Sequence, residues 1–447
     1  MRSKKVIQPK VSFQEINKIA IPAIIAGIAE PLISLTDIAI IGNVKVNAVE
    51  ALAAAGIVGS FLSALIWVIA QTKTAISATV SQHLGNNRLH AVRTLVPQTL
   101  YFNLGLSLVI YIITAFFSEL IFTAYNADGL ILTYAKSYYR IRALGYPLTL
   151  VTFAIFGVFR GMQNTLWAMK CSLVGAAVNM GLSYILVFGI DGIIPSYHIE
   201  GAAVASVVAQ FVMLSMAVYY YITKTNFGFE LRRKINPNLR PLLIMSFNLF
   251  LRTLALNIAI YMANTYATGY GKTYIAAQSI LMNIWLFFSF FIDGYANAGN
   301  AIGGRLLGAK AYQKLWLLSK DISKYAVIIA ISLSLICFIF YSDIGYFFNK
   351  DSDVLHAFSQ VFWIVLLMQP MNAIAFMFDG VFKGLGEAKY LRNLLLAATF
   401  LGFLPTLLIC DYFGLQLYGI WIAFSVWMFI RSSALVIQFR LKYLNKV

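Results

Sequence analysis

The chain has 447 residues, of which 60% are hydrophobic and only 11% are charged. Because an average soluble domain carries about 25% charged residues, this composition excludes an ordinary soluble protein and indicates a membrane protein. The formal net charge of +17 does not point to nucleic acid, because the basic residues gather in short segments between apolar stretches, where they orient a membrane protein.

Twelve apolar segments follow one another along the chain, and each is long enough to cross roughly 30 Å of hydrocarbon as an α-helix. The basic start of the chain has no small-residue cleavage site after it, so we expect a retained first helix. The sequence therefore predicts an all-α polytopic membrane protein with twelve transmembrane helices, at residues 14–42, 51–81, 95–124, 131–158, 167–190, 200–223, 239–268, 273–303, 321–348, 354–382, 390–411 and 415–440.

A sequence repeat divides the twelve segments into two halves. The phrase GVFRG at 157–161 returns as GVFKG at 380–384, which is 223 positions later, and Leu84-Gly85 returns at the same offset as Leu307-Gly308. With six helices each, both halves enter the membrane in the same orientation. We predict two pseudo-symmetric six-helix bundles: a lobe at 1–223, a cytoplasmic linker at 224–238 and a lobe at 239–447.

The repeated phrase is expected to form the inner end of one helix in each half. Its glycines would permit tight turns, and Arg160 and Lys383 would reach lipid headgroups. Two similar lobes with a cleft between them suit alternating access, in which the cleft opens to each side of the membrane in turn.

Lys and Arg are distributed unevenly between the two sides of the predicted membrane. If the amino terminus is inside, the outer loops hold only four of them, Lys45, Lys136, Lys272 and Lys350. This bias predicts a multi-pass protein of the plasma or inner membrane with both termini in the cytoplasm. We expect a monomer surrounded by the lipid bilayer.

Ionisable residues inside spans are costly, at about 2.5 to 3.5 kcal/mol for a central Asp, Lys or Arg, so they indicate function. The second half has two acids and two bases, which predicts a neutralised network of Arg252, Asp293, Asp379 and Arg431. The first half has two acids, Glu30 and Asp37, and one base, Lys73. One carboxylate is thus left without an obvious partner, and such a group can hold a proton or a small cation.

The first span reads IAIPAIIAGIAEPLISLTDIAIIG. Glu30 and Asp37 are seven positions apart and lie within about 20° of one helix face. Pro22 and Pro31 are expected to interrupt this helix, because each lacks a backbone donor. We interpret a bendable helix that carries a carboxylate as a gate. The alternative is that Pro31 bends a static helix and that Asp37 pairs with Lys73.

The sequence lacks the motifs that would indicate an enzyme or a metal site. The three cysteines lie in apolar stretches, and the four histidines are scattered without a second ligand at helical spacing. TGYGKT at 268–273 has Tyr266 where a phosphate-binding loop requires its first glycine. We predict no enzyme, metal or cofactor, so transport against a gradient would need ion coupling.

Several segments resemble the multidrug and toxic compound extrusion (MATE) transporters, and their DNA-damage-inducible protein F (DinF)-like branch in particular. They are EPLISLTDIAIIG at 30–42, YRIRALGYP at 139–147, FRG at 159–161, FLRTLAL at 250–256, DGYANAGNAIGGRLLGA at 293–309 and FDGVFKGLGEAKYLRN at 378–393. The resemblance implies twelve helices in two lobes. It also implies export of small organic compounds, often cationic and amphiphilic, in exchange for protons or sodium.

The resemblance also implies roles for single residues. Asp37 lies at the family's first-helix carboxylate, and Pro22 at the proline where that helix bends. In the fifth helix Asn179 fits the family pattern, whereas Ser183 stands where the family has Asp. Ser206 matches a hydroxyl position of the sixth helix. With a single acid we favour proton coupling, although neutral oxygen ligands also suit sodium.

In the second half, Asp293 and Asp379 match family positions as well, and we expect a structural or gating role for them with Arg252 and Arg431. The sequence predicts a secondary antiporter that exports organic compounds. The alternative is a flippase for a lipid-linked precursor, which would have more basic residues lining its cavity to hold pyrophosphate.

Overall fold

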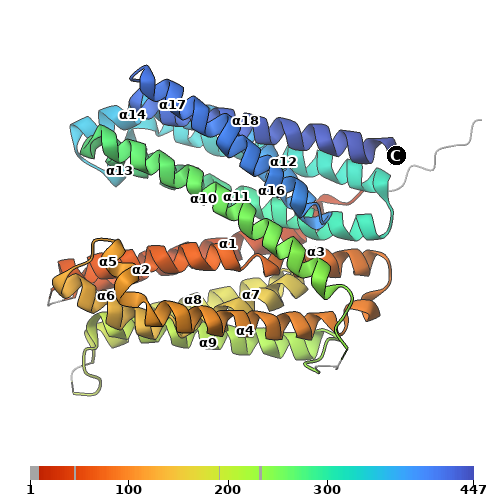
Figure 1. The fold of residues 1–447 in the computed structure, drawn as a ribbon, viewed down its shortest axis with the longest axis horizontal. Coiled ribbons are helices and arrows are strands. Elements are labelled where there is room, and N and C mark those ends of the chain that lie inside the picture. Colours follow the sequence, from red (N-terminus) through yellow and green to blue (C-terminus); the bar gives the residue numbers. More distant parts are fainter. Residues whose placement is uncertain (1–9, 45–46, 191, 231–233, 447) are drawn as a thin grey trace, which may run out of the picture. The chain divides into compact units, whose positions relative to one another are not determined.

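The computed structural model describes residues 10–44, 47–190, 192–230 and 234–446, apart from the side chains of residues 30–32, 34, 35 and 445. This part of the chain is built from helices (Figure 1), which confirms the predicted fold class. The helices of the first half are α1 (Phe13–Ile41), α2 (Ala48–Ile69), α3 (Thr72–Gly85), η1 (Leu89–Val92), α4 (Leu95–Phe116), α5 (Ser118–Ala124), α6 (Gly129–Arg142), α7 (Gly145–Gly161), α8 (Leu166–Phe188) and α9 (His198–Lys224). Those of the second half are α10 (Leu239–Tyr270), α11 (Lys272–Gly308), α12 (Tyr312–Ile339), α13 (Tyr341–Phe348), α14 (Ser352–Leu367), α15 (Gln369–Gly384), α16 (Ala388–Ala397), η2 (Ala398–Phe403), α17 (Leu404–Tyr412), α18 (Gln416–Tyr443) and η3 (Leu444–Lys446).

The helices account for the predicted spans. Among the described residues, nine helices are long and apolar enough to cross a membrane, and two bent pairs raise that number to 11. Helix α1, with 29 residues, rises about 43 Å at 1.5 Å per residue, so its length also suffices. These twelve elements match the twelve predicted segments.

Breaks within spans recur at the offset of the sequence repeat. The pair α6 and α7 is bent by 46° and the pair α14 and α15 by 51°. Pro147 and Pro370, which are 223 positions apart, lie just after these breaks. A proline lacks the donor that would continue the preceding helix, so the duplicated proline explains the duplicated bend. Both spans had been expected as single helices.

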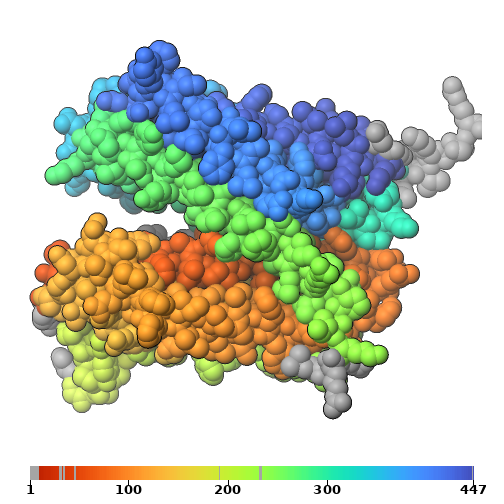
Figure 2. Space-filling model, in the orientation of Figure 1, coloured from red at the N-terminus to blue at the C-terminus, as the bar shows by residue number. Residues whose placement is uncertain are grey.

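The chain packs into two units, which do not follow chain order throughout. One unit comprises residues 1–24, 81–87 and 244–447, and the other comprises residues 25–80 and 88–243. Within each unit, side chains fill the spaces between neighbouring ribbons (Figure 2). Helix α1 contributes its first turns to one unit and the rest to the other. The lobe limits expected from the linker stay a prediction.

The glycines of the repeated phrase lie inside helices α7 and α15 and serve helix packing. A Cβ added at Gly157 would lie 2.4 Å from the carbonyl oxygen of Lys73 in α3. A Cβ at Gly380 would lie 2.3 Å from the carbonyl oxygen of Ala296 in α11. Ala296 is 223 positions after Lys73, so the two halves repeat the same close helix contact. The expectation that these glycines form turns was therefore wrong, because their spacing is that of a GxxxG packing motif.

The second repeated pair makes a helix crossing inside the unit that contains the second half. A Cβ at Gly85 would lie 1.8 Å from the carbonyl oxygen of Arg305, and a Cβ at Gly308 would lie 1.9 Å from that of Gln82. The two contacts are equivalent, because Gly308 lies 223 positions after Gly85 and Arg305 lies 223 positions after Gln82. The ends of α3 and α11 thus meet as equivalent segments, and only glycine lets the backbones approach this closely.

Gly157→Ala is expected to destabilise the protein, because the added methyl group meets backbone that cannot move alone. Overpacking of this kind costs about 1 to 3 kcal/mol, and it should lower the thermal unfolding midpoint of the purified protein in detergent. Gly181→Ala in α8 is the matched control, since nothing lies within 4 Å of its added Cβ. Equal midpoints for the two variants would contradict the packing role.

Candidate functional site

Asp37 lies in α1 and is 4% exposed, inside the unit formed by residues 25–80 and 88–243. Its carboxylate accepts two hydrogen bonds from hydroxyl groups. Ser183 Oγ in α8 donates to Asp37 Oδ1 at 2.9 Å, and Ser206 Oγ in α9 donates to Asp37 Oδ2 at 3.1 Å. Three helices therefore converge on one buried carboxylate, and both hydroxyls are themselves buried.

Asn179 extends this cluster by one residue. It lies four positions before Ser183 on the same face of α8, and its Nδ2 donates to Ser206 Oγ at 2.9 Å. Its other side-chain atom, Oδ1, is buried and has no hydrogen-bond partner among the residues that the structure describes. A buried acceptor without a donor is costly, so this oxygen is available for a proton donor or a cation beside Asp37.

Asp37 has no ion pair with Lys or Arg among the described residues. The alternative pairing with Lys73 is therefore not formed, and the Lys73 ammonium lies 4.6 Å from the ring centroid of Phe153. The basic side chain that attracts Asp37 electrostatically is Arg142, at the end of α6. Its guanidinium carbon lies 6.0 Å from the ring centroid of Tyr138, and its Nε is buried without a hydrogen-bond partner in the described part of the chain.

Sequence reasoning missed Arg142 as a neighbour of Asp37. It becomes a neighbour of Asp37 because the span bends between α6 and α7, so that Arg142 ends one helix segment within the span. The signal was present in the LGYP run at 144–147, since a Gly and a Pro two residues apart often mark a helix break.

The cluster can hold a proton or a small cation. Neutral hydroxyl donors stabilise the ionised carboxylate without neutralising it, and hydrogen bonds to a charged group contribute about 1.5 to 3 kcal/mol each. The carboxylate, the two hydroxyls and the free amide oxygen are also hard oxygen ligands of the kind that bind alkali and alkaline-earth cations. The four residues predicted as a coupling site thus lie together.

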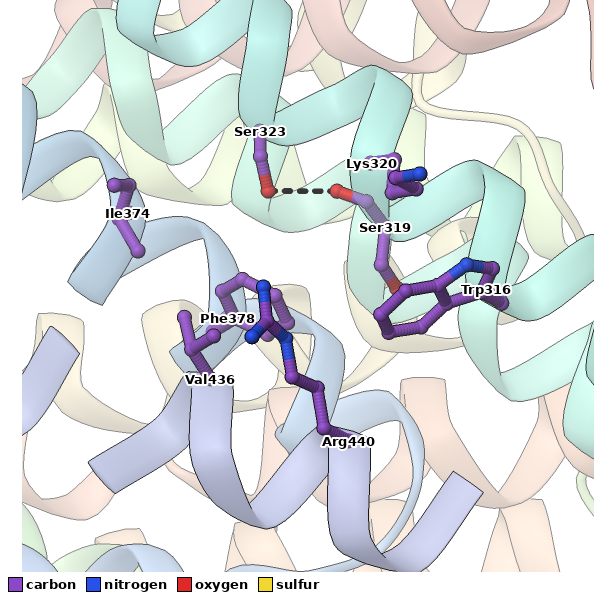
Figure 3. A pocket seen from close by; sticks show the side chains of 8 residues that line it. All are labelled: Trp316, Ser319, Lys320, Ser323, Ile374, Phe378, Val436 and Arg440. Atoms are coloured by element: carbon purple, nitrogen blue, oxygen red, sulfur yellow. Dashed lines mark hydrogen bonds between the residues drawn. The ribbon is translucent and has the colours of Figure 1, made fainter. Parts of the chain in front are cut away.

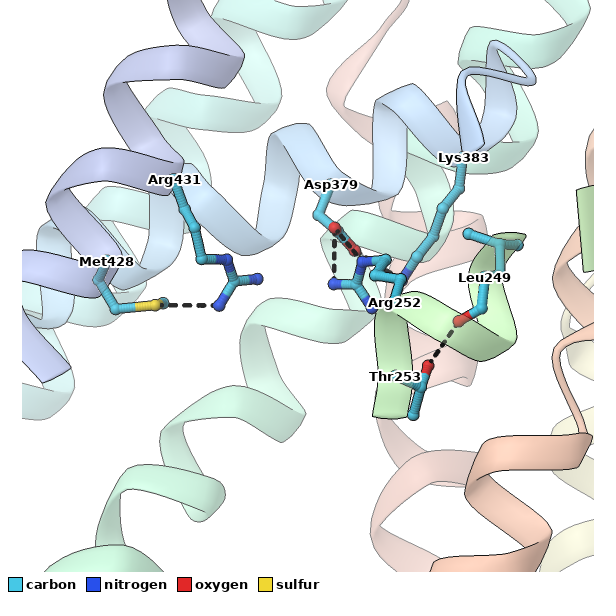
Figure 4. A network of polar contacts seen from close by, with 7 residues as sticks. All are labelled: Leu249, Arg252, Thr253, Asp379, Lys383, Met428 and Arg431. Carbon is cyan, nitrogen blue, oxygen red and sulfur yellow. Dashed lines mark hydrogen bonds and ion pairs between the residues drawn. The ribbon is translucent and has the colours of Figure 1, made fainter. Parts of the chain in front are cut away.

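A second charged cluster lies in the other unit (Figure 4). Arg252 in α10 donates through Nε to Asp379 Oδ1 in α15 at 2.8 Å, and its Nη2 lies 2.6 Å from the same oxygen. Lys383, one turn further along α15, places its Nζ 2.6 Å from Asp379 Oδ2. Asp379 thus pairs with two cations, and both Asp379 and Arg252 are at most 5% exposed.

The structure differs from the sequence expectations for these basic residues in two details. Lys383 pairs with Asp379 instead of reaching headgroups, because its helix position puts it one turn from a buried carboxylate, and Arg160 is also buried. Arg431 in α18 contacts no acid among the described residues. Its Nη1 donates to Met428 Sδ at 3.1 Å, its guanidinium carbon lies 4.6 Å from the Trp427 ring centroid, and its Nη2 is buried without a partner.

The remaining predicted residues are placed as follows. Pro22 is buried in α1, which continues unbroken past it, so the expected interruption of the helix is not seen in the backbone. A proline removes one hydrogen bond but does not by itself end a helix. The side chains of Glu30 and Pro31 lie outside the described residues. Asp293 lies in α11 and acts electrostatically on Lys383.

Asp379→Ala is expected to lower the free energy of unfolding by about 3 to 5 kcal/mol, because it leaves the buried Arg252 without a counter-charge. Unfolding in mixed detergent micelles measures this difference. Asp321→Ala is the matched control, since Asp321 pairs at 3.8 Å with Lys10, whose side chain is 61% exposed. That pair should contribute less than about 1 kcal/mol, and similar losses for both variants would contradict the structural role of Asp379.

Three comparisons place this arrangement among known proteins. The chain is 25% identical to DNA damage-inducible protein F of Escherichia coli, and the match covers 96% of this chain and 92% of that protein. It is 27% identical to Protein DETOXIFICATION 42 of Arabidopsis thaliana across 74% of this chain, but the match spans only 62% of that longer relative. A crystal structure of MATE in the bent conformation superposes with a TM-score of 0.89 at 20% identity, covering 97% of this chain and 96% of the other.

The sequence model of the MatE family matches the chain twice, at residues 22–185 and again at 245–408. The two matches are offset by the same 223 positions as the repeated glycine phrases and together cover about three quarters of the chain. The duplication inferred from GVFRG and GVFKG is thus a duplication of the family unit itself, and the chain belongs to the MatE family, with a DinF-like relationship.

Proposed function

We propose that the protein is a secondary antiporter that exports small organic compounds across the plasma or inner membrane in exchange for protons. The observation that carries the proposal is the buried carboxylate of Asp37, whose hydrogen-bond partners among the described residues are all neutral. A carboxylate that is ion-paired with Lys or Arg stays ionised and does not exchange a bound proton or cation. An acid held by hydroxyls can take up a proton or a cation and release it when its surroundings change.

Helix α1 provides a route from this occupancy change to a conformational change. Pro22 lies two residues before the point where α1 passes from one packing unit to the other. The missing backbone donor of Pro22 weakens the helix there. Protonation of Asp37 alters the hydrogen bonds that hold the later turns of α1 to α8 and α9. The first helix is therefore the proposed gate.

Sodium is the second candidate for the coupling ion. Asn179 Oδ1 and the hydroxyls of Ser183 and Ser206 could join Asp37 around a dehydrated cation. A single carboxylate gives less charge to offset dehydration than the two in the family pattern, so the proton remains our proposal. The flippase alternative is not favoured by the comparisons. We also propose that the protein is a monomer in the lipid bilayer, with both termini in the cytoplasm.

Asp37→Asn is expected to abolish substrate export driven by an ion gradient, because the amide cannot ionise yet has nearly the same shape. Reconstituted vesicles loaded with a fluorescent organic cation measure export after a pH jump. The rate should fall to that of vesicles without protein.

Asp128→Asn is the matched control, because this exposed carboxylate in the same unit caps α6 without a side-chain hydrogen bond. It should keep the wild-type rate. Full export by the Asp37 variant would refute the assigned role, provided that both variants elute as folded protein at equal amounts.

Ser183→Asp tests the choice of ion. Two carboxylates that share a site favour a bound cation, because like charges otherwise repel, so export by this variant should acquire a dependence on the sodium gradient. Wild-type protein should release or take up protons on substrate addition in sodium-free buffer. Simultaneous pH and sodium flux measurements check both results. Sodium-dependent exchange by the wild type without proton movement would contradict proton coupling.

A further inference from the structure

An apolar groove with a basic mouth lies on the unit that contains the second half (Figure 3). Trp316 and Lys320 of α12 form one side, Phe378 of α15 forms the floor, and Arg440 of α18 forms the other side. Its cavity volume of about 180 Å³ is below the roughly 300 to 1,000 Å³ of pockets that enclose drug-sized ligands. The groove is therefore too small for a whole substrate but has room for part of a chain-like molecule.

The two hydroxyl groups that line the groove are already engaged in hydrogen bonds. Its two hydroxyls bond to their own helix, since Ser319 Oγ donates to the Leu315 carbonyl at 3.0 Å and Ser323 Oγ to the Ser319 carbonyl at 2.6 Å. Ile374, Phe378 and Val436 supply the remaining apolar surface. Hydrocarbon suits such a wall, because a polar ligand would lose its water contacts without replacement.

The mouth carries two cations without acidic partners. Lys320 and Arg440 are exposed, and neither forms an ion pair or a hydrogen bond within the described part of the chain. Nearby acids are already engaged, since Asp321 pairs with Lys10 and Glu387 with Lys442. The Lys320 ammonium lies 5.6 Å from the Trp316 ring centroid.

The spans predicted from the sequence place these residues at the membrane boundary. Lys320 directly precedes the predicted span 321–348, and Arg440 ends the predicted span 415–440. Trp316 is an aromatic side chain of the type enriched at this level. The predicted orientation puts this boundary on the cytoplasmic side, where the leaflet is anionic and each Lys or Arg near the surface gains about 1 kcal/mol from it.

We propose that the groove binds an anionic phospholipid of the cytoplasmic leaflet. The headgroup phosphate lies between Lys320 and Arg440, and one acyl chain follows Phe378 and Ile374 along the groove. This site is separate from Asp37 and its hydrogen-bonding partners, and it does not depend on the transport mechanism. It would make the lipid a bound component of the protein.

Tryptophan quenching by brominated lipids tests the proposal. The full chain is reconstituted in vesicles of phosphatidylcholine that contain either brominated phosphatidylglycerol or brominated phosphatidylcholine. The Trp316 signal is the difference between wild type and Trp316→Phe. We expect stronger quenching by the anionic lipid, with its relative binding constant falling about fivefold for each of Lys320→Gln and Arg440→Gln.

Lys324→Gln is the matched control, because Lys324 is exposed one turn along α12 and does not line the groove. It should keep the preference. Equal quenching by both lipids, or an equal loss in the control variant, overturns a specific site in favour of diffuse surface charge. If neither lipid quenches Trp316 and the protein is dimeric, the groove holds a second copy of the chain, which also overturns the proposal.

Discussion

The low-dielectric interior of a membrane protein makes every buried charge depend on its neighbours, and two aspartates of this chain meet that constraint in opposite ways. Asp379 lies between Arg252 and Lys383, so its charge is offset twice over. Within the described part of the chain, Asp37 receives hydrogen bonds from neutral side chains. The first arrangement fixes the protonation state of its carboxylate, and the second leaves it adjustable. Burial of the same side chain thus yields a structural pair in one unit and a candidate ion site in the other.

The duplication separates what the fold requires from what the site requires. Helix breaks, bends and glycine contacts recur 223 positions apart, as Gly157 and Gly380 illustrate with nearly equal close approaches to a facing helix. The carboxylate of the Asp37 cluster does not recur, although one of its hydroxyls does. At that offset Asp37 corresponds to Ile260, and Ser183 to Thr406. Packing needs small residues at fixed places in both halves, whereas one ion site is enough for the molecule.

Much of this fold could be predicted because hydrophobic length and repeat offset act over whole segments. The three residues around Asp37 could be predicted because Asn179 and Ser183 share a helix face and occupy two positions of a family pattern. What could not be predicted depends on contacts between distant helices. Lys383 turns towards Asp379 only because α15 continues as a helix, and Arg142 reaches the electrostatic range of Asp37 only because its span bends. The sequence likewise does not show whether a glycine forms a turn or allows two helices to pack closely.

The excess of buried positive charge in the second half adds a constraint on how that unit can work. Three cations, Arg252, Lys383 and Arg431, act on the single carboxylate of Asp379. Arg431 relies on aromatic faces and a sulfur atom, which are weak partners for a guanidinium. Such a cluster repels a second cation, which favours Asp37 over Asp379 as the proposed place for a proton or sodium ion. The asymmetry of charge between two halves with the same helical plan therefore supports the proposal that ion binding belongs to one of them, with α1, which has residues in both packing units, as the proposed link to the other.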